Sequence, residues 1–135
     1  MQEAMHSVSP PAAPSRPRSG PRIAARTAGP VFRADKFVVP VDMLDDFMAQ
    51  IQRVDRIVAA LPGCLRHLVL VQLDGQGRND DAVEVMTIVE WSDAQALRAA
   101  KEQMQRRYAS AGFHPAAFMQ ALGVKADLGS YGLAI

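Results

Sequence analysis

The chain has 135 residues, a formal net charge of +1 and a hydrophobic fraction of 49%, which together indicate one ordinary globular domain with enough residues to bury a core. Its one cysteine, Cys64, excludes an internal disulfide and a cysteine-rich zinc site within one chain. No run approaches the roughly 18 to 20 consecutive apolar residues of a membrane-spanning helix, and no basic strand studded with aromatic residues occurs. We therefore expect neither a membrane nor a nucleic acid as partner, with the cytoplasm as the default location.

Residues 1–30 differ in composition from the rest of the chain. They contain six of the nine prolines, four arginines, one acidic residue and no sustained hydrophobic periodicity. Such a segment cannot bury enough apolar surface to offset the entropy lost on ordering, so we predict a disordered extension. The folded domain is then predicted to span residues 31–135.

A strand and an amphipathic helix open this domain. Residues 31–39 (VFRADKFVV) predict a strand that Pro40 stops. The apolar residues of 44–61 recur at spacings of mostly three and four, which predicts a helix with one apolar stripe. Asp42 is placed to cap this helix, and the Pro-Gly pair at 62–63 ends it.

Two strands joined by a polar loop form the centre of the domain. Residues 64–73 and 82–91 are rich in Val, Leu and Ile, and the Gly, Asp and Asn residues between them predict a hairpin with a long loop. A register with Leu70 opposite Met86 gives one face an apolar middle with oppositely charged residues at its rim. We adopt this register because a shift by two residues sets a leucine against a glutamate.

The two faces of the hairpin carry different side chains. One face has four large apolar residues at its centre: Leu68, Leu70, Met86 and Ile88. The opposite face runs from Leu65 on one strand to Trp91 on the other, with His67 and Thr87 as its conventional polar groups. Because both faces are apolar at their centres, each needs a cover.

A longer helix, a short helix and a last strand complete the chain. Ser92 and Gln95 have the spacing of a capping box, which predicts the start of the longer helix. Pro115 lies in the first turn of the short helix, and Gly123 ends it. Residues 124–131 then predict a fourth strand.

The order β-α-β-β-α-(α)-β predicts an α+β fold of the ferredoxin-like type, in which helices cover one face of a four-stranded antiparallel sheet. The other face keeps its exposed apolar centre. Because a bare apolar face marks an interaction site, we predict a homodimer formed sheet to sheet. The predicted interface residues are Leu68, Leu70, Met86 and Ile88.

The sequence also resembles a known family. The stretch PGCLRHLVL, a second strand ending in VEW and a helix opening SDAQAL resemble the antibiotic biosynthesis monooxygenases, a family of dimeric α+β barrels. The resemblance covers residues 31–131 and implies an oxidoreductase that oxidises polyketide quinones without a cofactor. Haem-degrading enzymes and isomerases have similar barrels.

The resemblance extends to the site residues in part. Quinone-oxidising members of the family hold a Trp at the end of this strand, which Trp91 matches, and an Asn four residues earlier, where this chain has Thr87. Thr87 has no amide to polarise a phenolate or a peroxy intermediate. Haem-degrading members place a His on the following helix, and residues 93–110 contain none, which disfavours haem.

His67, Thr87 and Trp91 are the first site predicted from the residues themselves. In the functional interpretation His67 assists proton removal, Thr87 supplies a hydrogen bond and Trp91 stacks on an aromatic ligand. In the alternative interpretation His67 is a core histidine bonded to a backbone carbonyl, and the other two residues serve packing alone. His67 and Thr87 are thus the candidate catalytic residues, with Trp91 as the candidate substrate-binding residue.

Tyr108, His114 and Tyr131 are further candidate substrate-binding residues. The small residues of 109–115 would let this loop gate a pocket between the second and third helices, with Tyr108 and His114 at its mouth. The alternative is a surface loop with an exposed histidine and two amphipathic tyrosines. The three histidines of the chain show no metal-ligand spacing, so we expect neither a metal nor another cofactor.

Two functions follow from the sequence. The first is a cofactor-independent monooxygenase acting on an aromatic or polycyclic, quinol-like small molecule. The second is a non-catalytic dimeric module of the same fold that binds a small apolar ligand. An enclosed pocket beside His67 and Trp91 would favour a ligand or catalysis, whereas a filled core there would favour plain architecture.

Overall fold

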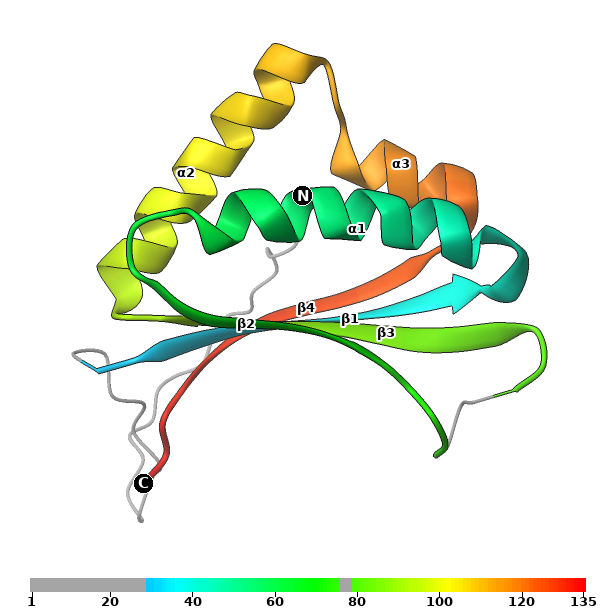
Figure 1. The fold of residues 1–135 in the computed structure, drawn as a ribbon, viewed down its shortest axis with the longest axis horizontal. Helices are drawn as coiled ribbons and strands as arrows, with labels where there is room; N and C mark the ends of the chain where they lie inside the picture. The colour runs from blue at the N-terminus through cyan, green and yellow to red at the C-terminus, as the bar shows by residue number, and fades with distance from the viewer. Residues whose placement is uncertain (1–28, 76–78) are drawn as a thin grey trace, which may run out of the picture.

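The structure is a computed structural model that describes residues 29–75 and 79–135, and its sheet carries the α-helices on one side (Figure 1). In chain order the elements are β1 (Val31–Pro40), the 3₁₀ turn η2 (Val41–Met43), α1 (Leu44–Ala59), β2 (Cys64–Val71), β3 (Ala82–Trp91), α2 (Ala94–Ala111), α3 (Pro115–Leu122) and β4 (Lys125–Gly132). The strand order is β2-β3-β1-β4, with antiparallel pairing throughout. This is the ferredoxin-like arrangement, so the predicted α+β fold class is confirmed. The predicted extension, residues 1–30, lies outside the described residues except for its last two.

Strands β2 and β3 pair in the predicted register, with Leu70 opposite Met86. A β-bulge at the start of β2 changes one detail, because Cys64 pairs with Trp91 and leaves Leu65 as the extra residue. The prediction that Leu65 shares the face of Trp91 is therefore wrong. The bulge turns Cys64 into the core instead and leaves Leu65 58% exposed.

The predicted cap of α1 is also wrong. Asp42 lies in the 3₁₀ turn, and the N-cap position belongs to Met43, which makes no side-chain capping bond. The backbone N–H of Val41 donates to the carbonyl of Asp81 at 2.9 Å. This bond connects the 3₁₀ turn to the loop before β3, and α1 begins directly after the turn.

Asp93 caps α2 in place of the predicted Ser92. The Asp93 Oδ1 atom accepts a hydrogen bond from the backbone N–H of Ala96 at 2.8 Å, and the Asp93 backbone is extended, as a cap requires. The backbone N–H of Ser92 instead donates to the carbonyl of Gly63 at 2.8 Å. Ser92 thus continues the pairing of β3 with the start of β2.

Two hydrophobic clusters hold the helices on the sheet. The buried members of the first are Val31, Leu61, Trp91, Leu97, Ala100 and Met104, and those of the second are Phe37, Val39, Phe47, Val85 and Val124. Helix α1 contributes partly buried residues to both clusters, which confirms its predicted apolar stripe. Within residues 29–75 and 79–135, no helix is both long and apolar enough to cross a membrane.

Within the part of the chain that the structure describes, no helix covers the outer face of the sheet (Figure 1). Of the four predicted interface residues, Leu68 and Leu70 are 40% and 43% exposed, while Met86 and Ile88 are partly buried. Tyr131 lies on the same face, because it pairs with the outward-facing Phe32 of β1. The apolar face predicted from the sequence is present, and its partner stays a prediction.

Candidate functional site

A polar band crosses the helix-covered face of the sheet between the two hydrophobic clusters. The strand registers arrange the side chains of this face in rows that run across all four strands. One row consists of Val69, Thr87, Asp35 and Leu128, and the next consists of His67, Val89, Arg33 and Ser130. We define the polar band as Thr87, Asp35, His67, Arg33 and Ser130. The rows on either side of it belong to the two apolar clusters.

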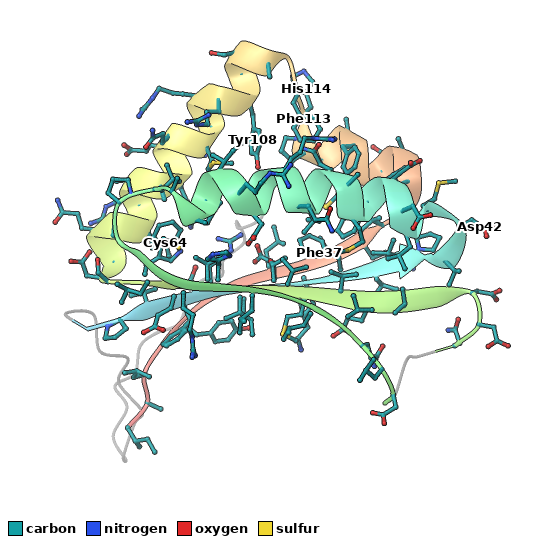
Figure 2. All side chains as sticks on the ribbon, viewed as in Figure 1. Phe37, Asp42, Cys64, Tyr108, Phe113 and His114 are labelled. Carbon is teal, nitrogen blue, oxygen red and sulfur yellow. The ribbon has the colours of Figure 1, made fainter. Side chains whose placement is uncertain are left out.

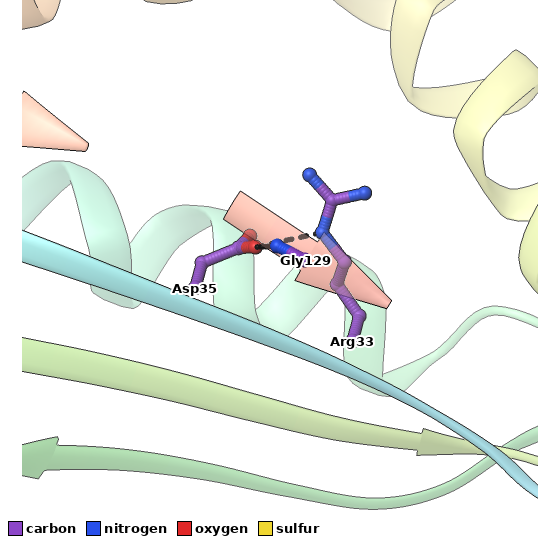
Figure 3. A network of polar contacts seen from close by, with 3 residues as sticks. All are labelled: Arg33, Asp35 and Gly129. Atoms are coloured by element: carbon purple, nitrogen blue, oxygen red, sulfur yellow. Dashed lines mark hydrogen bonds and ion pairs between the residues drawn. The ribbon is translucent and has the colours of Figure 1, made fainter. Parts of the chain in front are cut away.

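Arg33 and Asp35 form an ion pair in the middle of the band (Figure 3). The Arg33 Nε atom donates to Asp35 Oδ1 at 2.7 Å, and the backbone N–H of Gly129 donates to the same oxygen at 3.3 Å. The two side chains are 24% and 17% exposed, so both are largely but not completely withdrawn from water. The two residues stand two positions apart on β1 and share a face with the buried Phe37 and Val39, so both point toward the helices.

The charges of the band act on one another and on α2. Burial raises the pKa of the Asp35 carboxyl, and the Arg33 charge, the hydrogen bonds from Arg33 and Gly129 and the Lys101 charge oppose this rise. Burial also lowers the pKa of the Lys101 ammonium on α2, with a further contribution from the Arg33 charge. The Asp35 carboxylate of raised pKa thus lies beside the Arg33 guanidinium, and the charge of the exposed Lys101 acts on it as well.

His67 lies at the edge of the band, on β2. Its Nδ1 atom is 3.0 Å from both carboxylate oxygens of Asp55 on α1, and its side chain is 39% exposed. The alternative of a core histidine bonded to a backbone carbonyl is wrong, because the edge strand leaves the ring open to solvent and beside a carboxylate. The predicted catalytic role of His67 stays a prediction.

Thr87 and Trp91 lie in different surroundings. Thr87 pairs directly with Asp35, so the structure brings this predicted catalytic residue to the ion pair. Trp91 is only 3% exposed and belongs to the buried cluster that also contains Leu97 and Ala100. Its ring nitrogen Nε1 is buried without a hydrogen-bond partner among the described residues. Stacking of a ligand on this ring would require the core to open.

Tyr108, Phe113 and His114 gather where α2 leads into α3 (Figure 2). The Tyr108 and Phe113 rings lie 5.4 Å apart, and the Phe113 and Phe118 rings 5.5 Å apart. Burial raises the pKa of the Tyr108 hydroxyl, whereas His114 is exposed at the N-cap of α3. Tyr131, on the outer face of the sheet, is separated from both predicted companions.

Sequence reasoning missed Arg33, Asp35 and the charge of Lys101 as parts of the site. The available signal was the alternation of side chains between the two faces of β1, which puts Arg33 and Asp35 on the same face as the buried Phe37 and Val39. Two charged residues in the middle of an otherwise buried face are the exception that marks a site. Within the described residues, no group of three or more His, Cys, Asp or Glu side chains could hold a metal ion.

No protein-family profile matches the sequence, and no curated protein matches it. Solved structures do match. An asparagine-to-alanine variant of SnoaB, a cofactor-independent oxygenase from Streptomyces nogalater, is 25% identical with a TM-score of 0.56, over 80% of this chain and 96% of that one. A candidate antibiotic biosynthesis monooxygenase from Deinococcus radiodurans is 18% identical with a TM-score of 0.55, over 78% of this chain and 95% of that one.

A dimeric ferredoxin-like protein from an uncultured marine organism also matches. It is 13% identical with a TM-score of 0.56, over 78% of this chain and 97% of that one. These matches span almost the whole of the solved chains and most of this one. The resemblance to the antibiotic biosynthesis monooxygenases is thereby confirmed, and this chain has their fold.

Proposed function

We propose that the chain is a cofactor-independent monooxygenase that oxidises an aromatic, quinol-like small molecule at the polar band. The observation that carries the proposal is the partly buried Asp35–Arg33 pair between two apolar clusters. Apolar residues of similar volume often stabilise a fold as well as a buried ion pair does, so the pair points to a function. The fold shared with SnoaB, which is described as a cofactor-independent oxygenase, supports the reaction class.

Asp35 is the proton acceptor in this proposal. Burial raises its pKa, which makes its carboxylate a stronger base than that of an exposed aspartate. The neighbouring Arg33 guanidinium stabilises the anion that forms when the substrate hydroxyl loses its proton. In this proposal Thr87, which pairs with Asp35 across the two strands, donates its hydroxyl hydrogen to the same substrate oxygen.

The reaction balances without a metal, a flavin or an added reductant. In an anthrone-type substrate, the enolate that forms when the hydroxyl of the enol tautomer loses its proton is rich enough in electrons to reduce O₂ itself. The ring CH₂ becomes a carbonyl, so that one oxygen atom of O₂ enters the substrate and the other leaves as water. The substrate supplies all four electrons, and the proton taken up by Asp35 returns with the water.

Oxygen uptake by the purified full chain tests this proposal. The panel consists of anthrones, with a chelator present and no flavin added. We expect one O₂ consumed per quinone formed, and a fall in kcat/KM of about 100-fold or more in Asp35→Asn. Asp127→Asn is the matched control, since Asp127 pairs with Lys36 on the outer face of the sheet. An unchanged rate in Asp35→Asn, or no turnover of any panel member, would contradict the proposal.

A non-catalytic module that binds a small ligand at the same band is the second candidate function. The burial of Trp91 favours it over catalysis. The Trp91 ring was predicted to stack on the substrate, but it is enclosed in the core and not open to a ligand. Ligand binding without oxygen uptake would select this function.

The assembly proposed for either function is a homodimer joined through the outer face of the sheet. The exposure of Leu68 and Leu70 supports it, on a face that no helix of the described residues covers. A further support is that one protein of similar fold is described as dimeric.

A further inference from the structure

Gly129 lies in the middle of β4, an edge strand of the sheet. Among the described strands β4 pairs with β1 alone, and Gly129 has no side chain to pack against its neighbours. A glycine within a strand weakens it and often marks a place where other atoms approach the backbone closely. The backbone of Gly129 nevertheless holds a specific partner, because its N–H donates to Asp35 Oδ1 at 3.3 Å (Figure 3).

The Tyr131 ring lies over Gly129 on the outer face of the sheet. A Cβ atom built on Gly129 would be 2.8 Å from the Tyr131 hydroxyl oxygen, 2.9 Å from Cε1 and 3.1 Å from Cζ. Cβ atoms in proteins are essentially never found closer than 3.0 Å to other heavy atoms, so only a glycine leaves room for the ring in this position. An aromatic ring that covers a glycine of an edge strand is a known way to stabilise such a strand. Gly129 is accordingly half-buried, whereas Ser130 beside it is exposed.

The two oxygens of the Asp35 carboxylate have different surroundings. Oδ1 accepts hydrogen bonds from Arg33 Nε at 2.7 Å and from the Gly129 N–H at 3.3 Å. Oδ2 accepts no hydrogen bond from residues 29–75 and 79–135. Two donors on one oxygen restrict the rotation of the carboxylate and leave the other oxygen open to a substrate proton.

The contacts of Gly129 thus connect the two faces of the sheet. Its N–H reaches Asp35 on the helix-covered face, and the Tyr131 ring lies against its backbone on the outer face. At 3.3 Å the bond to Asp35 is longer than the usual range of about 2.7–3.2 Å, so a small shift of the edge strand is enough to break it. The ring limits that shift.

We infer that Tyr131 is a positioning residue for Asp35: its ring holds the backbone of Gly129 from the outer face, so that the Gly129 N–H keeps Asp35 Oδ2 turned toward the substrate. The inference rests on the proposed function for the role of Asp35 as proton acceptor. It adds to that function a residue that the substrate does not touch, on the opposite face of the sheet from the polar band.

The bond from Gly129 also affects the ionisation of Asp35. Burial raises the pKa of the Asp35 carboxyl, and the Gly129 N–H is one of the groups that oppose this rise, because a donated hydrogen bond favours the charged form. Loss of the bond therefore raises the Asp35 pKa further and lets the carboxylate rotate. The first effect can be measured without a substrate, and the second lowers kcat.

A pH titration followed by nuclear magnetic resonance tests the inference on the full chain without substrate. The observed signals are the side-chain carboxyl carbon of Asp35 and the backbone amide of Gly129. In the wild type we expect the amide signal to move with the same midpoint as the carboxyl. In Tyr131→Ala the Asp35 midpoint should rise, and the Gly129 amide should follow it more weakly. Tyr131→Phe keeps the ring and should behave as the wild type does.

Oxygen uptake with an anthrone gives the second measurement. We expect Tyr131→Ala to lower kcat by about three- to tenfold, the range of one lost hydrogen bond. KM should stay within about twofold, because Tyr131 does not touch the substrate. Tyr131→Phe should restore most of the rate.

Further variants exclude indirect causes. Val38→Ala removes apolar surface from another exposed position of the outer face and should leave the Asp35 midpoint and kcat unchanged. Leu70→Glu, which is expected to separate the proposed dimer, shows what the loss of assembly does by itself. If it raises the Asp35 midpoint as much as Tyr131→Ala does, the ring acts through assembly and the inference is overturned. Circular dichroism checks folding, and should Tyr131→Ala not fold, Tyr131→Thr decides, since threonine favours strands but has no ring.

The outcomes separate this inference from the proposed function. An Asp35 midpoint that is the same in Tyr131→Ala and in the wild type would overturn the inference, whatever the rate does, and would leave the proposed function standing. A fall in kcat without that change would reflect a general loss of structure. A raised midpoint that Tyr131→Phe restores supports the inference even if no anthrone is oxidised, and the proposed function alone then fails. A raised midpoint with an unchanged kcat would show that Asp35 is not the proton acceptor.

Discussion

Gly63 and Ala96 lie so close together that a Cβ atom added to Gly63 would be 2.5 Å from the Cβ of Ala96. Gly63 precedes β2 and Ala96 stands in the first turn of α2, so this contact sets how near the helix comes to the edge of the sheet. Gly63 also has a φ of 86°, in the left-handed region that other residues rarely adopt.

Replacement of Gly63 should therefore be severe. We expect Gly63→Ala to lower the free energy of unfolding by about 2–4 kcal/mol, from overpacking and backbone strain together. Gly112→Ala separates the two causes, because Gly112 has a φ of 67° but no atom of the described residues lies within 4 Å of an added Cβ. It should cost about 1–2 kcal/mol. Urea unfolding measures both, and equal losses in the two variants would show that the Ala96 contact is unimportant.

The cap of α2 provides a second prediction. Asp93→Ala should lower the free energy of unfolding by about 1 kcal/mol, because the N–H of Ala96 loses its acceptor. Ser92→Ala should change it by less than about 0.5 kcal/mol, as at ordinary surface positions. Thermal and urea unfolding of the two variants check this. A larger loss in Ser92→Ala would restore the capping box predicted from the sequence.

Asp35 should make stability depend on pH. Because its pKa is raised in the folded chain, the folded state holds the Asp35 proton more tightly than the unfolded state does. Its contribution to the free energy of unfolding therefore falls as the pH rises from the ordinary aspartate value of about 3.9 through the folded pKa, and is constant above it. Urea unfolding across this range should show a shallower fall in Asp35→Asn. A slope in Asp35→Asn identical to that of the wild type would contradict the prediction.

The contact between His67 and Asp55 should contribute little to stability and little to the reaction rate. We expect His67→Ala to cost less than about 1 kcal/mol, because the pair is open to solvent. If Asp35 is the proton acceptor, kcat/KM should stay within about threefold of wild type. A fall of about 100-fold, the size of a lost general base, would return that role to His67. Asp55→Asn, measured alongside, shows whether the partner carboxylate takes part.

The outer face of the sheet should join two chains. Leu70→Glu places a charge at the centre of this face and should convert a dimer into a monomer at micromolar concentration, as measured by sedimentation. Val41→Glu is the control, since Val41 is equally exposed at 43% but lies in the 3₁₀ turn. A monomeric wild-type chain would remove the prediction.

Much of the fold could be predicted because its signals are local. Alternating apolar residues and turn formers gave the strands, and cross-strand partners such as Leu70 and Met86 gave the register. Details decided by backbone angles could not be predicted. Ser92 and Asp93 are both good caps, and only the extended conformation of Asp93 selects it. The extra residue at Leu65 leaves no mark in the pattern of apolar residues.

The candidate site was predictable in part for a similar reason. The face of Thr87 followed from the hairpin, and the same alternation on β1 would have added Arg33 and Asp35. The approach of Lys101 depends on how α2 packs across the sheet, which residue spacing within one helix does not determine. The burial of Trp91 is likewise a product of long-range packing, since Leu61, Leu97 and Met104 come from distant parts of the chain.

The interior is divided into two apolar clusters, and the polar band between them is the part of the interior with the fewest hydrophobic contacts to stabilise it. Hydrophobic contacts stabilise the fold on either side of the polar band. The two sides are joined to each other by the paired strands and by helix α1, which contributes residues to both clusters. A rigid ligand bound at the polar band would contact both clusters and so stabilise the folded state. Because a ligand that binds only the folded chain raises its stability, the melting temperature measured with different small molecules can be used to screen for the natural substrate.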